Sequence, residues 1–258
     1  MNYIVGQFPL VRKQNLSINC WDFLVYCPEV AAFAKPGQFC HLKAEGFALR
    51  RPISICEIDR KNGTVRLVFE VRGDGTQVIS NTEVNGTVDM IAPLGNGFTI
   101  LPEDSRAIAV GGGIGVPPML ETIKRYGKNG TAVLGFRSKD AVILVKDFME
   151  TGAQTILCTD DGTDGQKGFV TLPLQDILQQ KTADIVYACG PRGMLKGVVS
   201  LCEKYGVRCE VSLEERMGCG IGACLVCACK CVKNGREFYA HVCTDGPVFN
   251  AKEVSFDE

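Results

Sequence analysis

The chain has 258 residues, 46% of them hydrophobic, which suits two compact domains or two domains with a small appended module. Its 28 basic side chains nearly cancel its 29 acidic ones, leaving a net charge of −1. This balance argues against a nucleic-acid-binding surface and against a polybasic membrane patch. The first residues lack the apolar core of a signal peptide, and no apolar run approaches the length of a membrane span. We therefore expect a cytoplasmic protein with no nucleic-acid or membrane partner.

The first segment, residues 1–100, is predicted to form a small antiparallel β-barrel. Short apolar stretches alternate there with turn signals, among them Asn62-Gly63 and Asn85-Gly86. Asn-Gly between two extended runs is a strong hairpin signal, and several closely spaced strands favour a barrel. The predicted strands cover residues 21–26, 38–42, 65–71 and 87–91.

The second segment, residues 101–210, changes to an alternation of strands and helices. This alternation predicts a doubly wound parallel sheet. The predicted strands cover residues 106–110, 131–136, 155–158 and 184–188. The predicted helices cover residues 119–126, 172–180 and 193–205.

Fourteen cysteines need an explanation, because disulfides are rare in the cytoplasm and a cysteine cluster there more often binds metal or is catalytic. Six of the fourteen fall within 25 residues, namely Cys219, Cys224, Cys227, Cys229, Cys231 and Cys243. Most of the others are scattered among apolar neighbours and are interpreted as small buried hydrophobes. Examples are Cys20, Cys27, Cys40 and Cys56.

The third segment, residues 211–258, is too short to bury a core of its own, so a metal centre is the expected staple. Cys219, Cys224 and Cys227 have the spacing C-x4-C-x2-C, and Cys243 follows as a fourth thiol. This is the plant-type spacing for a [2Fe–2S] cluster. Small residues between the first two cysteines let backbone N–H groups point at the sulfur atoms.

Two other metal centres fit the cysteines less well. Structural zinc usually shows two close cysteine pairs, whereas here only Cys224 and Cys227 form such a pair. A Rieske centre needs two histidine ligands, and the whole chain has only two histidines. Cys229 and Cys231 share one face of an extended strand with Cys227 and are interpreted as non-ligands, although a redox or ligand role for one of them stays open.

Two loops of the second segment predict a dinucleotide site. Residues 107–118 run from a strand through Gly-Gly-Gly-Ile-Gly into a helix, which lets the backbone approach a pyrophosphate. Residues 187–191, Tyr-Ala-Cys-Gly-Pro, end the fourth strand at the carboxyl edge, where doubly wound folds bind ligands. Each loop alone could be a tight turn without a ligand, and it is their combination that favours the site.

The first segment also carries a possible anion site. Arg51 could pair with a phosphate, and Ser54 lies three residues further along the same strand. Taken alone, however, Arg50 and Arg51 are more simply explained as a basic pair on an edge strand. Residues 72–76, Arg-Gly-Asp-Gly-Thr, precede a possible helix whose cap would be the threonine and whose glycines open room for an anion.

These motifs, in this order, resemble the ferredoxin reductase-type flavoproteins over nearly the whole chain. In that family an R-P-x-S strand binds FAD, a G-G-x-G-x-x-P loop and a C-G-P turn bind the nicotinamide nucleotide, and a barrel precedes the α/β domain. The resemblance implies FAD contacts from Arg51, Pro52, Ile53, Ser54, Val68, Phe69, Glu70, Gly75 and Thr76. It implies nucleotide contacts from Gly112, Gly113, Gly115, Cys189, Gly190 and Pro191. The three consecutive glycines, where the family has two, are a departure.

The third segment, residues 211–258, restricts the resemblance to one group within this family. Its run Glu-Arg-Met-Gly-Cys-Gly-Ile-Gly-Ala-Cys is similar to that of the electron-transfer subunits of class 1B dihydroorotate dehydrogenases, which act in pyrimidine biosynthesis. This implies a [2Fe–2S] cluster on Cys219, Cys224, Cys227 and Cys243. It also implies an FMN-containing catalytic subunit as partner, in a complex of two copies of each, whose electrons pass through the cluster and FAD to NAD⁺. The chain shows no catalytic base for dihydroorotate, and the resemblance gives Cys189 a shaping role beside the nicotinamide and flavin rings.

Other interpretations stay open. The chain could serve another NAD(P)-linked oxidoreductase, of the ferredoxin:NADP⁺ transhydrogenase, sulfide or hydrogenase type, or be a zinc-stapled binding module. Local residues do not decide between NAD and NADP: Arg137-Ser138 could hold a 2′-phosphate, and Asp160-Asp161 a free ribose. The resemblance favours NAD.

Overall fold

The computed structural model describes residues 2–180 and 183–256, and the chain forms two compact units. The barrel unit comprises the residues up to Gly97 together with Glu214–Cys229 and Tyr239–Val248. The sheet unit comprises Phe98–Leu213, Lys230–Phe238 and the residues from Phe249 on. The division into domains at residues 100 and 210 stays a prediction, and its ends, residues 1, 257 and 258, lie outside the described residues.

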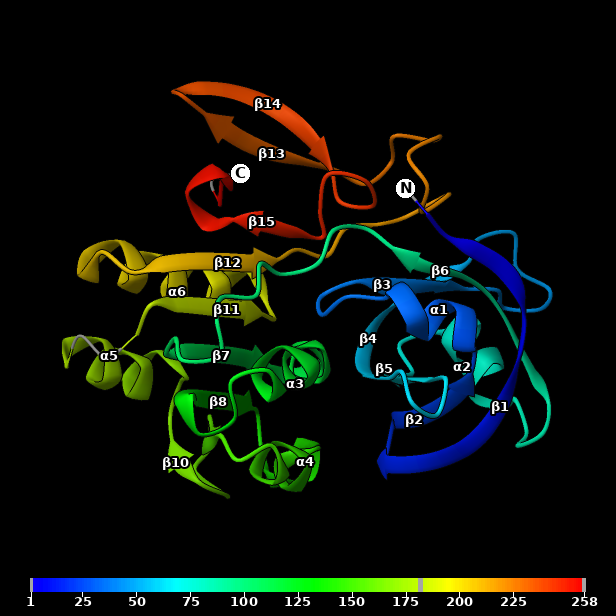
Figure 1. The fold of residues 1–258 in the computed structure, drawn as a ribbon, viewed down its shortest axis with the longest axis horizontal. Helices are drawn as coiled ribbons and strands as arrows, with labels where there is room; N and C mark the ends of the chain where they lie inside the picture. Colours follow the sequence, from blue (N-terminus) through cyan, green and yellow to red (C-terminus); the bar gives the residue numbers. More distant parts are fainter. Residues whose placement is uncertain (1, 181–182, 257–258) are drawn as a thin grey trace. The chain divides into compact units, whose positions relative to one another are not determined.

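The barrel unit contains a closed antiparallel barrel, as predicted. Within the described residues its strand order is β1-β2-β5-β4-β3-β6 (Figure 1). The strands are β1 Ile4–Ser17, β2 Cys20–Tyr26, β3 Phe39–Leu42, β4 Arg51–Asp59, β5 Thr64–Glu70 and β6 Thr87–Leu94. Two short helices accompany them, α1 Pro28–Phe33 and α2 Asp74–Ser80.

The barrel differs from expectation at two strands. The long strand β1 pairs with both β2 and β6, but only its Phe8 and Leu10 are buried, so it carries little hydrophobic signal. Strand β4 pairs with β3 on one side and β5 on the other. The expectation that Arg50 and Arg51 belong to an edge strand is therefore wrong, because a closed barrel has no edge.

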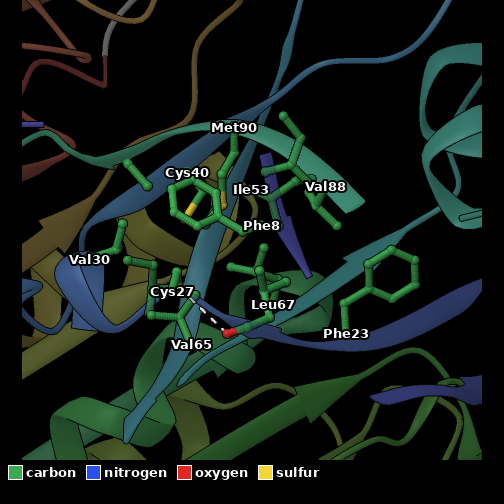
Figure 2. Close-up of a cluster of buried hydrophobic side chains, with 14 of the residues drawn as sticks. Phe8, Phe23, Cys27, Val30, Cys40, Ile53, Val65, Leu67, Val88 and Met90 are labelled. Carbon is green, nitrogen blue, oxygen red and sulfur yellow. Dashed lines mark hydrogen bonds between the residues drawn. The ribbon is translucent and has the colours of Figure 1, made fainter. Parts of the chain in front are cut away.

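The scattered cysteines of the barrel are core residues, as predicted. Figure 2 shows Cys27 and Cys40 among the apolar side chains that fill the barrel, with Phe8, Leu67 and Met90 around them. Cys27 and Cys40 are fully buried. Burial raises the pKa of Cys27 to about 12 and raises the pKa of Cys40 well above the ordinary 9.0. These thiols stay protonated and pack like small apolar groups.

The sheet unit contains the predicted parallel sheet with helices. Its described strands follow the order β10-β9-β8-β7-β11-β12-β15, and Figure 1 shows β8, β7, β11 and β12 side by side. The chain order reverses between β7 and β11, which is the switch point of a doubly wound sheet. The strands are β7 Ala107–Gly112, β8 Gly130–Phe136, β9 Gln154–Thr159, β10 Gln166–Lys167, β11 Ile185–Cys189, β12 Arg208–Ser212 and β15 Val248–Asn250.

The helices agree with the predicted ones and add one. They are α3 Pro117–Lys124, α4 Val145–Glu150, α5 Thr171–Gln179 and α6 Arg192–Tyr205. Helices α5 and α6 pack against the apolar side chains of the central strands. The unpredicted α4 has only six residues, too few to show a helical hydrophobic period. None of the helices within residues 2–180 and 183–256 is long and apolar enough to cross a membrane.

A hairpin of β13 Ala228–Lys233 and β14 Arg236–His241 completes the described fold. Cys229 and Cys231 alternate on β13 and are both buried. Their side chains thus share one face of an extended strand, as the sequence indicates.

Candidate functional site

A loop in the barrel unit surrounds the sulfur of Cys219 with hydrogen-bond donors. The N–H groups of Ile221, Ala223 and Cys224 lie 3.4, 3.2 and 3.3 Å from that sulfur. The chain bends back on itself here because Gly220 and Gly222 adopt φ angles of +74° and +85°, which favour glycine. This is the amide cradle that the small residues of the loop predict.

The four predicted cluster cysteines lie as two pairs. The main-chain N–H of Cys219 lies 3.4 Å from the sulfur of Cys224, and that of Cys243 lies 3.4 Å from the sulfur of Cys227. The thiols within each pair are also hydrogen-bonded to each other. A [2Fe–2S] cluster bound by four cysteines takes two on each iron, so two thiol pairs suit it.

The same geometry suits a single zinc ion less well. Zinc needs four ligands around one point, with zinc–sulfur distances of about 2.3 Å. Across the described residues, no three histidine, cysteine, aspartate or glutamate side chains are arranged to hold one ion. The assignment of the four cysteines as cluster ligands stays a prediction.

The two pairs have different environments. Cys219 is partly exposed and Cys224 is exposed, whereas Cys227 and Cys243 are buried. Burial opposes ionisation of Cys219, but the surrounding N–H groups and the Cys224 thiol outweigh it and lower the pKa of Cys219 to about 7. Burial, with the neighbouring Cys227, raises the pKa of Cys243 to about 12. The loop thus stabilises negative charge at its outer pair.

Two side chains, which the sequence did not single out, fasten these loops to the barrel. Nδ1 of His41, on β3, lies 3.2 Å from the carbonyl oxygen of Cys219. The side-chain amide of Asn96 donates to the carbonyls of Thr244 and Asp245, each at 2.9 Å. The contacts span 148 to 178 positions of sequence, so only the fold reveals them.

The predicted FAD-binding strand brings Arg51 against Gly75. A Cβ atom at Gly75 would lie 2.4 Å from the Arg51 guanidinium, so a side chain at position 75 would displace the guanidinium from its present place. The guanidinium also lies over the Phe47 ring, 5.3 Å from its centroid. Gly75 belongs to the first turn of α2, where N–H groups have no partner within the helix. A positive side chain and main-chain donors thus meet at one point, a suitable cradle for a phosphate of FAD.

Arg50 and Thr76 have structural partners. Arg50 forms an ion pair with Asp89 at 2.7 Å and donates to the carbonyls of His41 and Asp89. The helix begins earlier than predicted, at Asp74 with Gly73 as its N-cap, so Thr76 lies in the first turn and is not itself the cap residue. Its hydroxyl accepts hydrogen bonds from the N–H groups of Arg72 and Gly73 at 3.0 and 3.3 Å and so closes a capping box. Arg51 also has main-chain partners, since its guanidinium donates to the carbonyls of Leu49 and Arg50, but of the two arginines it is the one that lies against Gly75.

The side chains of the other predicted FAD residues differ in how exposed they are. Pro52 is exposed and Ser54 is partly exposed, so their side chains are accessible. Ile53 and Phe69 belong to the barrel core, so these positions would offer main chain to a cofactor. Val68 is buried too, and the Glu70 carboxylate is held by Arg72 at 2.7 Å. The assignment of these residues to FAD stays a prediction.

The two predicted nucleotide loops meet in the sheet unit. A Cβ atom at Gly115 would lie 2.4 Å from the carbonyl oxygen of Cys189. A Cβ atom at Gly190 would lie 3.1 Å from Gly112, and Gly190 has a φ of +154°. The loops after β7 and β11 therefore contact each other at the switch point, and only glycine permits the approach. Pro191 caps α6, and Gly113 has a φ of +54° with open space beside it.

The residues that would choose between NAD and NADP also share one edge of the sheet. The N–H of Asp161 donates to the carbonyl of Arg137 at 3.3 Å, and both side chains are exposed. Hydrogen bonds from Thr163 lower the pKa of Asp161. A cation and a carboxylate thus stand side by side, and the local chemistry keeps both nucleotides open.

Comparison with known proteins gives three kinds of relative. The sequence pattern described as "Iron-sulfur cluster binding domain of dihydroorotate dehydrogenase B" matches residues 214–255. A protein of Geobacillus sp. (strain WCH70), named "Dihydroorotate dehydrogenase B (NAD(+)), electron transfer subunit", is 42% identical over 96% of this chain and 97% of its own. The protein of the same name from Geobacillus thermodenitrificans (strain NG80-2) is 44% identical over 95% and 96% of the two chains.

Solved structures agree on the fold. A chain from the study "Insights into flavin-based electron bifurcation via the NADH-dependent reduced ferredoxin-NADP oxidoreductase structure" is 32% identical, with a TM-score of 0.83 over 97% of this chain and 90% of that one. "Ferredoxin reductase in carbazole 1,9a-dioxygenase" shares the fold at 19% identity, with a TM-score of 0.68 over 80% and 67% of the two chains.

Proposed function

Since the chain belongs to the family of dihydroorotate dehydrogenase B (NAD(+)) electron transfer subunits, we propose that it carries electrons from a separate catalytic subunit to NAD⁺. When bound, a [2Fe–2S] cluster would supply single-electron transfer, and FAD would supply the step between single electrons and a hydride. The chain's own residues hold and tune both groups.

The observation that carries this proposal is the paired arrangement of Cys219/Cys224 and Cys227/Cys243 under the amide donors of the loop. The donors stabilise thiolate charge at Cys219, and thiolates are what iron binds. The buried pair is shielded from water, while the exposed pair faces outward. Electrons would enter most directly from the exposed side.

Arg51 and Gly75 would receive the phosphates of FAD, and Pro52 and Ser54 would contact it along β4. In the sheet unit, the glycines at 112, 113 and 115 would approach the nucleotide with main-chain N–H groups. Cys189 is buried and its carbonyl oxygen lies against Gly115, and its side chain would shape the site beside the nicotinamide and flavin rings. The names of the relatives specify NAD(+), which we adopt for this chain.

The partner would dock on the apolar rim of the cysteine loop. Ile221, Leu225 and Val226 flank the exposed Cys224, and their side chains are 37%, 59% and 56% exposed. Exposed apolar side chains beside a polar site are typical of protein interfaces. We propose an FMN-containing catalytic subunit as occupant, in a cytoplasmic complex of two copies of each chain.

The first experiment is an anaerobic visible spectrum of the purified chain, with flavin, iron and acid-labile sulfide quantified. The proposal expects flavin bands with about two irons and two sulfides per chain. A colourless preparation that contains zinc, even after anaerobic reconstitution, would contradict it. Adding the catalytic subunit, dihydroorotate and NAD⁺ should then produce orotate and NADH.

A second experiment tests the FAD site by Arg51→Ala. Losing a charge-assisted hydrogen bond of about 1.5–3 kcal/mol should weaken FAD binding about 10- to 100-fold. Titration of the flavin-free protein with FAD measures this dissociation constant. Arg51→Lys is the matched control, because it keeps the charge and should restore part of the affinity. Equal affinity in the wild type and the alanine variant would place FAD elsewhere.

A second candidate function has one observation in its favour. The chain resembles, at 32% identity over nearly its whole length, a chain from the study of a reduced ferredoxin-NADP oxidoreductase. In that function the chain would take part in electron exchange between ferredoxin and a nicotinamide nucleotide. Copurification distinguishes the two, since it retrieves either an FMN dehydrogenase or a ferredoxin-dependent partner.

A further inference from the structure

We propose that His41 is a positioning residue for the cluster: its imidazole holds the Cys219 loop in the shape that aims amides at the sulfur. The inference rests on the proposed function, because it assumes that Cys219 binds iron. His41 lies on β3 and is fully buried, with Nδ1 3.2 Å from the carbonyl oxygen of Cys219. A carbonyl oxygen only accepts, so Nδ1 carries the hydrogen and donates it.

Gly220 makes this contact specific. It follows Cys219 directly, has a φ of +74°, and packs against the ring. A Cβ atom at Gly220 would lie 2.6 Å from Nδ1 of His41. The ring therefore fills the space that a side chain at position 220 would need, and it sets how closely the loop approaches β3.

The hydrogen bond acts on the cluster through the peptide that follows Cys219. Its carbonyl belongs to the first peptide of the turn, and that turn delivers the N–H groups of Ile221 and Ala223 to the sulfur at 3.4 and 3.2 Å. Fixing the first peptide plane fixes the direction of the turn. Hydrogen bonds to sulfur favour the more negative, reduced cluster, so they raise its reduction potential.

The main chain of His41 contacts the strand that is predicted to bind FAD. His41 is the cross-strand partner of Pro52 on β4, and Arg50 donates to the His41 carbonyl at 3.3 Å. Both Pro52 and the cysteine loop belong to the barrel unit. One residue thus links the main chain of a cluster ligand to the strand that would carry FAD.

The test compares His41→Leu with His41→Asn in the full chain carrying FAD and its cluster. Leucine fills similar space without a donor, whereas the asparagine amide reaches the Nδ1 position and keeps one. Iron, sulfide and FAD are quantified first, and then the reduction potential and the electron paramagnetic resonance spectrum of the reduced cluster are measured. Gly220→Ala, which pushes the loop off the ring, is the second variant.

The expected result is a lower potential in His41→Leu and in Gly220→Ala, by about 59 mV for a tenfold change in the one-electron equilibrium constant. The g-values should shift in both, and His41→Asn should stay close to the wild type. Loss of the cluster in His41→Leu but not in His41→Asn would support the proposal equally.

Unchanged potential and g-values in His41→Leu would overturn the inference, as would an asparagine variant as perturbed as the leucine one. Failure of the underlying function would look different. In that case the wild type itself would contain no iron and sulfide, and no variant would need to be compared.

Discussion

The cysteine loop, residues 218–227, and the barrel core use the same side chain for opposite purposes within one compact unit. In the core, Cys27 is fully buried and burial raises its pKa to about 12. In the loop, Cys219 is partly exposed and N–H donors lower its pKa to about 7. Two causes make the difference: burial raises the pKa of Cys27, whereas two left-handed glycines direct main-chain N–H groups at the sulfur of Cys219 and lower its pKa. Burial and backbone conformation together thus decide which thiols ionise.

The sharpest way to break this comparison is to remove one thiol from each region. Cys219→Ala should lose essentially all cluster iron, because the cluster then lacks one of its four ligands. Cys40→Ala, the matched control in the core, should keep its iron and sulfide. The measurement is iron and acid-labile sulfide per chain. Equal iron in both variants would show that Cys219 is no ligand.

Alkylation of the cluster-free chain compares how readily the thiols of the loop and of the core ionise. Only the thiolate form of a cysteine reacts with the reagent. A thiol with a lowered pKa is therefore ionised, and reactive, at a lower pH. Cys219 should therefore react with a midpoint near pH 7, while Cys27, with a pKa of about 12, should stay protonated. We expect a rate ratio of at least about a thousandfold at pH 7, read by mass spectrometry after iodoacetamide. Comparable rates would show that the amides do not activate the loop.

The apolar side chains of the two regions also differ, because those of the loop face outward. Leu225→Ser should raise about tenfold the concentration of catalytic subunit needed for half-maximal electron transfer, since a buried leucine contributes about 1.5–3 kcal/mol. Ile18→Ser, at a side chain 87% exposed on the β1–β2 turn, is the control and should have no effect. An unchanged requirement in Leu225→Ser would remove the loop from the interface.

The smallest effect belongs to the core. Cys40→Ala removes one buried heavy atom and should lower the free energy of unfolding by about 1 kcal/mol. The single tryptophan, Trp21, packs against the barrel core, so its fluorescence reports urea unfolding of the barrel unit. Cys229→Ala offers a second buried thiol outside the barrel strands for comparison. A larger loss in Cys40→Ala, accompanied by loss of iron, would contradict a purely packing role.

Sequence patterns predicted the parts of the fold that repeat a local signal. Asn62-Gly63 located the hairpin between β4 and β5, and the glycine run located the βα turn after β7. The hairpin predicted at Asn85-Gly86 is wrong, because that turn joins α2 to β6, which pairs with β1 and β3. Strand β1 was not predicted, because most of its residues are exposed and it shows little alternation of buried and exposed positions. Helices α1 and α4 were not predicted, because six residues are too few to show a helical hydrophobic period. A strand's place in a sheet is equally invisible, which is why β4 was taken for an edge.

The candidate site likewise contains residues that the sequence singled out and residues that only the fold revealed. The spacing of the cysteines singled out Cys219, Cys224, Cys227 and Cys243, although it did not predict that they lie as two pairs. His41 and Asn96 have no such signal, because each makes its contact only after a barrel strand or turn meets a loop more than a hundred positions away. A buried histidine and an asparagine between glycines are ordinary until the fold gives them a partner.

The side-chain amide of Asn96 has a consequence for protein engineering. By donating to two carbonyls just after Cys243, it makes the turn between β6 and the second unit part of the frame of the fourth thiol. Anyone grafting this redox centre onto another barrel would therefore have to transplant the turn at residues 95–97 and strand β3 along with the cysteine segment. The redox centre is held by three stretches of chain, namely strand β3, the turn at residues 95–97 and the cysteine segment, so the cysteine segment alone would lack two of its supports.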